Sequence, residues 1–506
     1  MLHQNYDAII IGSGLGGLSC GAYLSKNKWK VVVLEKNNFP GGYASSFKNG
    51  HFTFDASLHM LDGVEKGKSM YYFLEKCGIG EKIEYIKLEH FARLIFPEHD
   101  IRLPSGNLDA LVKILENEFP HEREGIKALF KKMVRVHDDT LKFLKSTTPM
   151  LLQLPIFPIR YRALFPVMRK TTKHLIDKYL HDEKLKAILF ANYGFYGLPP
   201  SKLNVTAVFA NMDYWVSGAY YPKGGNQVIP DALVDLIRDN GGNVILNSEV
   251  TEIIIENKKA VGVITKQGEM FRGNEIISNI SAIETFNNLI GREKLPTKFL
   301  KKLDRMEPSV STIIVYIGLD ENFKSKLKYN EDYELFVSNT YDLDEDQKLS
   351  MDNNVQEASF FITIYTNVNP SLANGDRSIV CLVQGQNFEH WKKYETDYNN
   401  GKKEEYNKEK NRLAQILIKR AEQILPDLSE HIEVMSVSTP LTLKRFSGNT
   451  DGAFFGWATN VKQYSPMDRL TKLPIKNLYL SSAWSFPGGG QTSTIAGGYR
   501  VAQKLI

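Results

Sequence analysis

The chain begins with a short apolar run, a run of small residues and a second apolar run. Residues 6–11 are apolar except for Asp7, rich in β-branched side chains, and followed by Gly12, which predicts a buried parallel strand. Residues 15–26 predict a helix built from small residues, and residues 30–35 predict a second strand. Together the three elements predict a βαβ unit with a right-handed crossover.

Later periodicities predict strands and helices spread over the whole chain. Alternating apolar positions predict a strand in 51–60, whereas 107–192 is mostly helical in pattern and 226–240 predicts an amphipathic helix. The remaining expected elements are strands at 244–246, 250–255, 260–265 and 477–481, an exposed charged helix at 399–424 and a last helix at 491–505. Strands near both ends and in the middle indicate one domain assembled from separate segments.

Size and composition exclude several classes of protein. A chain of 506 residues exceeds the roughly 250–300 residues that share one core, so we expect two domains. A net charge of +5 is modest and argues against a nucleic-acid-binding protein. The cysteines form no CxxC pair, which argues against a disulfide scaffold or a cysteine zinc site and fits a reducing compartment; they are Cys20, Cys77 and Cys381.

The N-terminal residues have no basic stretch and no cleavage site of small residues, so we expect no signal peptide. The chain has no continuous apolar stretch of about 18 residues, so we expect no membrane-spanning helix. The nearest candidate, 187–222, is interrupted by glycine and proline and is better interpreted as buried core. These features predict a cytoplasmic protein.

The positive charge is concentrated in one window. Residues 141–180 hold eight bases and one acid, or +7, so the rest of the chain sums to −2. Because apolar residues at 149–158 lie among these bases, we interpret 141–180 as a helical region that contacts anionic lipid on the inner face of a membrane. The alternative is a solvated basic face beside a buried proline-rich loop. The bases are Lys142, Lys145, Arg160, Arg162, Arg169, Lys170, Lys173 and Lys178.

A glycine fingerprint follows the first strand. Gly12, Gly14 and Gly17 form G-x-G-x-x-G between a strand and a helix, and Glu35 follows 18 residues after Gly17 at the end of the next strand. The glycines allow a tight turn, a close backbone approach to a diphosphate and close helix packing, while the helix N-terminus attracts the phosphates. Glu35 can accept hydrogen bonds from ribose hydroxyls and would repel a 2′-phosphate, which favours a dinucleotide other than NADP.

A second glycine pair distinguishes an FAD-binding site from an NAD-binding site. Gly41 and Gly42 follow Glu35 closely and allow another stretch of backbone to lie against the same dinucleotide, which nicotinamide enzymes do not usually need. The fingerprint and this pair predict FAD.

The ordered set of motifs resembles the phytoene desaturase, carotenoid isomerase and retinol saturase family within the flavin amine-oxidase-like superfamily. The resemblance covers nearly the whole chain and is carried by 12–17, 35–36, 41–45, 52–59, 221–226, 250–253, 277–279, 439–440, 477–480 and 488–490. Residues 482–488 depart from the Gly-Ala-x-Thr-His-Pro-Gly often found in relatives, so the substrate and the reaction stay open.

The resemblance implies non-covalent FAD and an α/β fold with two domains. One is a discontinuous Rossmann-type FAD-binding domain formed by 1–62, 224–292 and 440–506. The other is an α+β substrate domain formed by 63–223 and 293–439, with a mixed sheet and a mainly helical insertion. The expected FAD-binding residues are Gly12, Ser13, Gly14, Leu15, Gly16, Gly17, Glu35, Lys36, Gly41, Gly42, Tyr43, Ala44, Ser45, His59, Met60, Val250, Ala483, Trp484, Gly490, Gln491 and Thr492.

Candidate catalytic groups are few. His59 is the best single candidate for a proton-transfer residue, although a hydrogen-bonded core histidine is the simpler interpretation. The helix that starts near Gln491 is expected to direct its N-terminus at the flavin, with Thr492, Ser493 and Thr494 as N-cap candidates. No spacing of His, Asp, Glu or Cys suggests a metal site.

The expected activity is desaturation, saturation or cis–trans isomerisation of C=C bonds in a long apolar polyene such as a carotenoid, a retinoid or an unsaturated lipid. The aromatic and aliphatic segments 187–222 and 311–319 fit a pocket for such a molecule, or plain core. An electron acceptor or donor is also implied. Two alternatives remain: an amine-oxidase-like flavoenzyme with a smaller polar substrate, and a non-catalytic FAD-containing lipid-binding protein.

Overall fold

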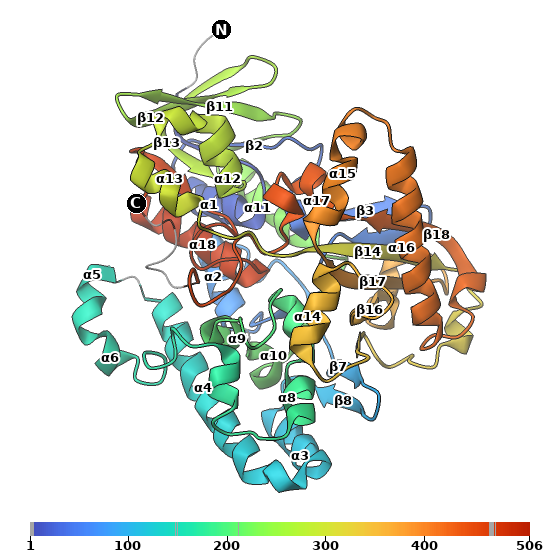
Figure 1. The fold of residues 1–506 in the computed structure, drawn as a ribbon. Helices are drawn as coiled ribbons and strands as arrows, with labels where there is room; N and C mark the ends of the chain where they lie inside the picture. Colours follow the sequence, from blue (N-terminus) through green and yellow to red (C-terminus); the bar gives the residue numbers. More distant parts are fainter. Residues whose placement is uncertain (1–4, 147, 149, 211, 465–469, 471) are drawn as a thin grey trace.

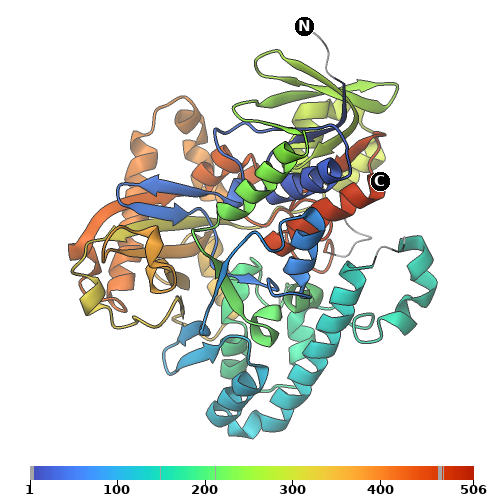
Figure 2. The ribbon, with the colours of Figure 1, turned by 180° about the vertical axis from the view of Figure 1, so that it is seen from behind.

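The computed structural model describes residues 5–146, 148, 150–210, 212–464, 470 and 472–506, and it contains two large sheets and a helical lobe (Figure 1). The C-terminus lies near the first sheet, and the helical lobe lies at the opposite end of the molecule (Figure 2). The cavity described below is lined by residues from all three parts.

The first sheet brings together the beginning, the middle and the end of the chain. Its parallel part has the order β10-β2-β1-β13, with β19 parallel to the end of β13, and β12 and β11 extend it in antiparallel fashion. The strands are β1 (Asn5–Ile11), β2 (Val31–Leu34), β10 (Asn243–Ile245), β11 (Val250–Glu256), β12 (Lys259–Thr265), β13 (Met270–Ser278) and β19 (Leu478–Leu480). The predicted segment-by-segment assembly of this sheet is therefore confirmed.

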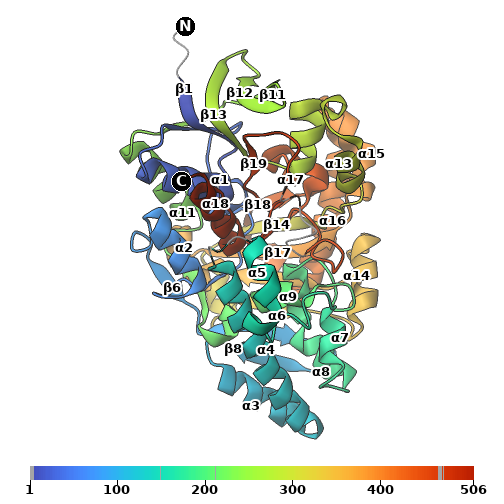
Figure 3. The same ribbon diagram turned by 90° about the vertical axis from the view of Figure 1, so that its left-hand side faces the viewer.

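Both faces of the first sheet are covered, as the continuous apolar strands require. Ala8 and Ile10 of β1 pack into a core shared with the small-residue helix α1, whereas Ile9 and Ile11 face a second core with Phe286. Helices α11 and α18 pack on α1 (Figure 3). The helices around this sheet are α1 (Leu15–Lys26), α2 (Ser69–Cys77), α11 (Val228–Asp239), α12 (Ala282–Glu284), α13 (Thr297–Leu303) and α18 (Gln491–Leu505), whereas α17 (Pro440–Ser447) packs on the second sheet, described next.

The second sheet is mixed, as expected for the substrate domain. Its order is β18-β14-β17-β16-β15-β7-β8, and only the β15–β7 pair is parallel within it. The strands are β7 (His90–Ile95), β8 (Asp100–Pro104), β14 (Ser311–Leu319), β15 (Glu334–Val337), β16 (Phe360–Ile364), β17 (Ser378–Gln386) and β18 (Ile432–Ser438). All residues of β14 are buried, so 311–319 is mainly core, and only Thr312 of this strand lines the cavity.

Helices α14 (Leu343–Met351), α15 (Phe388–Asn399) and α16 (Glu404–Glu422) accompany this sheet. The helix predicted at 399–424 is α16, which begins at residue 404 because the chain turns after α15, and many of its charged residues are exposed as expected. Leu413 and Leu417 of α16 are buried in the core on this side of the sheet, where α16 packs on β17 and β18. α16 is therefore an amphipathic helix: its apolar face packs on the sheet, and its charged face is directed to solvent.

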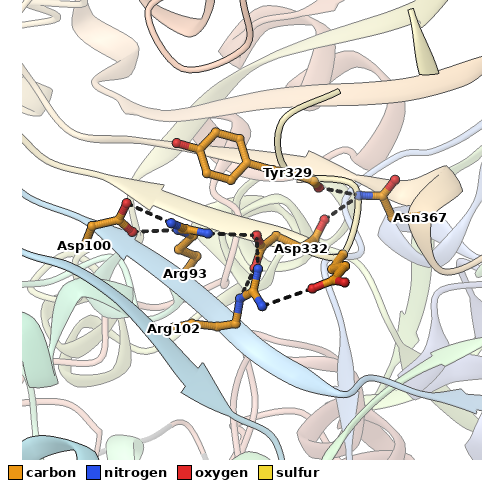
Figure 4. Close-up of polar contacts among 7 residues, drawn as sticks. Arg93, Asp100, Arg102, Tyr329, Asp332 and Asn367 are labelled. Carbon is orange, nitrogen blue, oxygen red and sulfur yellow. Dashed lines mark hydrogen bonds and ion pairs between the residues drawn. The ribbon is translucent and has the colours of Figure 1, made fainter. Parts of the chain in front are cut away.

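An ion-pair network ties the edge of the second sheet to the loop before β15 (Figure 4). The Asp332 carboxylate is 1% exposed and lies 2.8 Å from Arg102 and 3.3 Å from Arg93. Arg93 also binds Asp100 on β8 through two N–O contacts of 2.6 and 2.9 Å. Asn367 donates to the carbonyl oxygen of Asp332 from the neighbouring turn, which fixes the loop as well as the carboxylate.

The helical lobe confirms the helical pattern predicted for 107–192. It contains α3 (Leu108–Glu118), α4 (Arg123–Leu144), α5 (Met150–Gln153), α6 (Phe157–Arg160), α7 (Thr172–Ile176), α8 (Glu183–Leu189), α9 (Val205–Ala210) and α10 (Asp213–Val216). In the described part of the chain, no helix is both long and apolar enough to cross a membrane.

Two small sheets connect the lobes. One pairs β3 (Ser46–Asn49) with β4 (Phe52–Asp55), and the other has the order β5-β9-β6, from β5 (Leu61–Asp62), β6 (Tyr85–Lys87) and β9 (Ala219–Pro222). The second places the end of the His59–Asp62 segment beside the helical lobe.

Candidate active site

A cavity of about 550 Å³ opens at the carboxyl ends of the parallel strands of the first sheet. Gly12 follows β1, Glu35 follows β2, Asn279 follows β13 and Ser482 lies just beyond β19, and all four line it. The cavity also reaches side chains of the second sheet and of the helical lobe. A cleft at this edge of a doubly wound sheet is where such folds bind nucleotides.

Gly12 and Gly14 of the fingerprint line this cavity together with Gly16, and a side chain at any of the three would be strained or would collide with neighbouring atoms. Gly12 has φ +90°, and a Cβ atom on Gly16 would lie 2.3 Å from the carbonyl oxygen of Ser481. Asn279 clamps the loop: its Oδ1 accepts from the N–H of Gly17 at 2.9 Å and its Nδ2 donates to the carbonyl oxygen of Gly12 at 3.3 Å. The loop is thus held open for a ligand at the N-terminus of α1.

Glu35 lies at the cavity wall with both carboxylate oxygens already engaged. Oε2 accepts from the N–H and the hydroxyl of Ser13 at 2.8 and 2.7 Å, and Oε1 accepts from the N–H and the side-chain amide of Asn37 at 2.9 Å each. These bonds fix the carboxylate in one orientation. Each oxygen has further lone pairs, so Glu35 can still accept from a hydroxyl of the ligand.

The second glycine pair lies directly against the first glycine loop. The N–H of Gly41 donates to the carbonyl oxygen of Ser13 at 2.9 Å, and Gly41 forms a parallel bridge with Gly14. Tyr43 lines the cavity, and burial raises the pKa of its phenol to about 12. Two strands of backbone therefore border the same space, as the sequence predicted.

The N-terminus of α18 also borders the cavity, but the predicted caps were wrong. Gly490, with φ +95°, occupies the N-cap position, and no described side chain caps the first turn. Thr492, Ser493 and Thr494 instead lie inside the helix, and all three line the cavity. Gln491 Oε1 is buried without a hydrogen-bond partner among the described residues. The uncapped backbone N–H groups and the unpaired amide oxygen of Gln491 are suited to hydrogen-bond the polar ring of a ligand.

His59 is both hydrogen-bonded and part of the cavity wall. Its Nδ1 lies 3.2 Å from the Glu334 carboxylate and 3.0 Å from the Thr363 hydroxyl, and its ring contacts those of Phe195 and Phe361. The Glu334 side chain is fully buried. When Nδ1 donates to Glu334, Nε2 remains as the nitrogen available to the cavity.

A second acidic group at the cavity was missed by the sequence analysis. Asp62 is 5% exposed, and burial, followed by the charge of Asp213, raises the pKa of its carboxyl to about 8. The pKa of Asp213 is lowered instead: burial acts to raise it, but hydrogen bonds from His137 and Ser69 outweigh the effect of burial. An acid directly after an apolar run was the only sequence signal for Asp62; its partners come from distant segments.

The structure brings most of the predicted site residues to this cavity. Those that line it are Gly12, Gly14, Leu15, Gly16, Glu35, Lys36, Gly41, Gly42, Tyr43, Ala44, His59, Met60, Val250, Ala483, Trp484, Gly490, Gln491 and Thr492. Ser13, Gly17 and Ser45 lie behind the wall, where Ser13 holds Glu35, Gly17 meets Asn279 and Ser45 donates to the carbonyl oxygen of Gly42. Asn279 and Glu334 are supporting residues that had not been singled out for a role in the site.

The residues present fit FAD. The glycine loops leave room for a diphosphate, Glu35 suits a ribose, and the uncapped N-terminus of α18 with the unpaired Gln491 amide suits a flavin edge. Ser248 Oγ, also at the cavity wall, is a further buried polar atom without a partner among the described residues. Unpaired buried polar groups of this kind call for a ligand that pairs them.

Comparison with known proteins agrees with this fit. Residues 15–506 match the family model of flavin containing amine oxidoreductases. The chain is 27% identical to the chloroplastic prolycopene isomerase of Arabidopsis thaliana over 99% of this chain and 82% of that protein. It is 24% identical to the all-trans-retinol 13,14-reductase of Danio rerio over 94% of this chain and 82% of that protein.

Among solved structures, an oxidoreductase from Methanosarcina mazei matches with a TM-score of 0.62 and 18% identity, covering 98% of this chain and 100% of that chain. This match confirms the expected fold. The resemblance to carotenoid isomerases and retinol saturases and the FAD cofactor are confirmed as well. The chain therefore belongs to the flavin containing amine oxidoreductase family and is an FAD-dependent enzyme.

Proposed function

We propose that this enzyme acts on C=C bonds of a long apolar polyene. The observation that carries the proposal is the continuity of the cavity, which runs from the glycine loops to a wall of aromatic and aliphatic side chains. These are Leu58, Met60, Leu61, Phe195, Val310, Phe361 and Val383. The names of the two relatives, an isomerase of prolycopene and a reductase of retinol, support the same substrate class.

The roles of the chain's own groups follow from their surroundings. FAD supplies electron transfer to or from the carbon skeleton. In this proposal the glycine loops and the N-terminus of α1 hold its diphosphate, Glu35 holds its ribose, and the N-terminus of α18 stabilises negative charge on the flavin. His59, oriented by Glu334, holds or moves a proton at Nε2.

The test uses the purified holoenzyme under anaerobic conditions with candidate polyenes such as 15-cis-phytoene, prolycopene and all-trans-retinol. Bleaching of the flavin absorbance indicates oxidation of the substrate. Reoxidation of pre-reduced flavin together with a saturated product indicates reduction, and geometric isomers that form only after reduction indicate isomerisation. An absence of any response to polyenes, combined with bleaching by amines, would refute the proposal in favour of the amine-oxidase alternative.

We also propose that the segment 150–165 docks on an anionic membrane surface. Four large apolar side chains of this segment are 46–67% exposed: Leu152, Ile156, Ile159 and Phe165. Residues 147 and 149 of the predicted membrane-contacting region lie outside the described residues. Helices α5 and α6 of this segment lie at the periphery of the molecule (Figure 2). Exposed bases, among them Arg162 and Lys170, accompany them. Apolar tips among bases suit an anionic lipid surface.

Flotation with vesicles that contain phosphatidylserine tests this docking. A variant with both Leu152→Asp and Ile159→Asp should lose flotation. A separate variant, in which the bases at 160–173 are neutralised, should bind more weakly, and its binding should no longer depend on the salt concentration. The matched control replaces Lys402 and Lys408, which are exposed on another part of the surface, with glutamine. Unchanged flotation of the aspartate variant would refute the docking.

A further inference from the structure

Asp62 lines the cavity, and one of its carboxyl oxygens is buried without a partner among the described residues. It is the last residue of β5, its exposed fraction is 5%, and Oδ2 has no hydrogen-bond partner within the described part of the chain. Leaving a buried polar group unpaired is costly, so such an atom is normally paired by a ligand or by water. Asp62 takes no part in the cofactor site proposed above.

The neighbouring groups do not pair Asp62, because they pair one another. Asp213 on α10 is 1% exposed, its Oδ1 lies 3.2 Å from Nε2 of His137 on α4, and its Oδ2 accepts from Ser69 at 2.8 Å. Asp213 thus has hydrogen-bond partners of its own. Tyr214, which also lines the cavity, directs its hydroxyl to the carbonyl oxygen of Met60 at 3.4 Å.

The protonation state of the Asp62 carboxyl determines which chemical group of a ligand can bind to it. With its pKa raised to about 8 by burial and by Asp213, the carboxyl is protonated at neutral pH. A neutral carboxyl both donates and accepts hydrogen bonds, as a hydroxyl does. A neutral carboxyl offers an ammonium group no negative charge, and the nearby Asp213 carboxylate already lies 3.2 Å from His137.

The rest of this region suits the apolar body of a ligand. Tyr196, Phe195 and Tyr214 line the cavity together with Leu61. A hydrocarbon that enters must displace any water at Asp62 without replacing its hydrogen bonds, whereas a hydroxyl-bearing ligand replaces them. Sites built for one hydroxyl discriminate strongly against the analogue that lacks it.

We propose that Asp62 binds the hydroxyl end of the substrate, so that the polyene of this enzyme is an alcohol rather than a pure hydrocarbon. The inference rests on the proposed function and narrows its substrate class. It makes Asp62 a specificity-determining residue at the cavity wall, separate from the groups proposed to hold FAD.

The test compares two ligands that differ in one hydroxyl: all-trans-retinol, and axerophthene, which has a methyl group in place of the hydroxymethyl group. Binding to the oxidised holoenzyme is measured in the dark by quenching of tryptophan fluorescence. The wild type should bind retinol about 10- to 100-fold more tightly than axerophthene. In Asp62→Leu this preference should vanish, chiefly by loss of retinol binding, and Asp62→Asn should retain part of it.

The control variant is Asp332→Asn, which removes a buried acid of the Figure 4 network outside the cavity and should leave the preference unchanged. Flavin content verifies that each variant is folded, and the wild-type comparison holds even if Asp62→Leu fails to fold. Equal affinities in the wild type, or a preference that persists in Asp62→Leu, would overturn the inference but leave the polyene proposal standing. If neither ligand binds, the inference fails, and the flavin assay with phytoene and prolycopene judges the polyene proposal separately.

Discussion

Replacing Asn279 by alanine should weaken FAD binding although Asn279 need not touch the cofactor. The side-chain amide bridges the two ends of the glycine loop, from the N–H of Gly17 to the carbonyl oxygen of Gly12. Alanine removes both bonds and leaves the loop free to relax. The loop must keep one shape to border a diphosphate, so its loosening should be measurable as lost cofactor affinity.

The size of the effect follows from the two bonds. The bond from Gly17 is short, at 2.9 Å, and should contribute about 1 kcal/mol; the bond to Gly12, at 3.3 Å, should contribute about 0.5 kcal/mol. A total of about 1.5 kcal/mol corresponds to roughly a tenfold increase in Kd for FAD. Asn279→Asp should retain only the first bond and add a negative charge beside the diphosphate, so it should bind FAD at least as weakly.

The assay is titration of the apoprotein with FAD, followed by quenching of flavin fluorescence. Asn288→Ala, which changes an exposed asparagine outside the cavity, is the control and should leave Kd unchanged. A folded Asn279→Ala protein that binds FAD within twofold of the wild type would refute the argument that this clamp shapes the loop.

Other substitutions test the remaining arguments. Asp332→Asn leaves two arginines facing a neutral group and should cost about 3 kcal/mol in the free energy of unfolding, whereas Asp100→Asn, at a half-exposed site, should cost less than about 1 kcal/mol in the same denaturation assay. Equal losses of unfolding free energy in the two variants would contradict the argument that the buried Asp332 carboxylate is the more important of the two. Burial and a neighbouring carboxylate raise the pKa of Asp62 from 3.8 to about 8, so the folded state holds this proton more tightly than the unfolded state. The wild type should therefore lose about 1.4 kcal/mol of stability per pH unit, relative to Asp62→Asn, as the pH rises from 4 to 8; parallel stability curves would disprove it. Gly16→Ala should be purified with a reduced ratio of flavin absorbance to protein, because its Cβ would lie 2.3 Å from the Ser481 carbonyl oxygen; a normal ratio would show that the loop adapts.

Local patterns allowed accurate prediction where neighbouring residues decide the structure. The first strand, helix and strand were predicted within about two residues, because their apolar runs are bounded by Gly12 and Gly14 and need no distant partner. The N-cap of α18 was predicted wrongly, because the positive φ of Gly490 depends on the path by which the chain enters the helix. Threonine and serine are good caps, but here they follow the N-cap position by two to four residues and lie inside the helix.

The acidic groups of the cavity could not be found in this way. Asp62, His137 and Asp213 meet only when β5, α4 and α10 pack together, and each alone is an ordinary polar residue in the sequence. His59 was found as a candidate, but its partner Glu334 lies 275 residues away at the start of a buried strand. The role of His59 in proton transfer stays a prediction.

The first sheet also sets an order of events in the cell. Its parallel part needs β19 and is covered by α18, and both come from the last 30 residues of the chain. During synthesis these residues follow the glycine loop and the helical lobe, which are made much earlier. The cofactor cleft is therefore incomplete until β19 and α18 have been made, and the unfinished cleft is a stage at which chaperones can act.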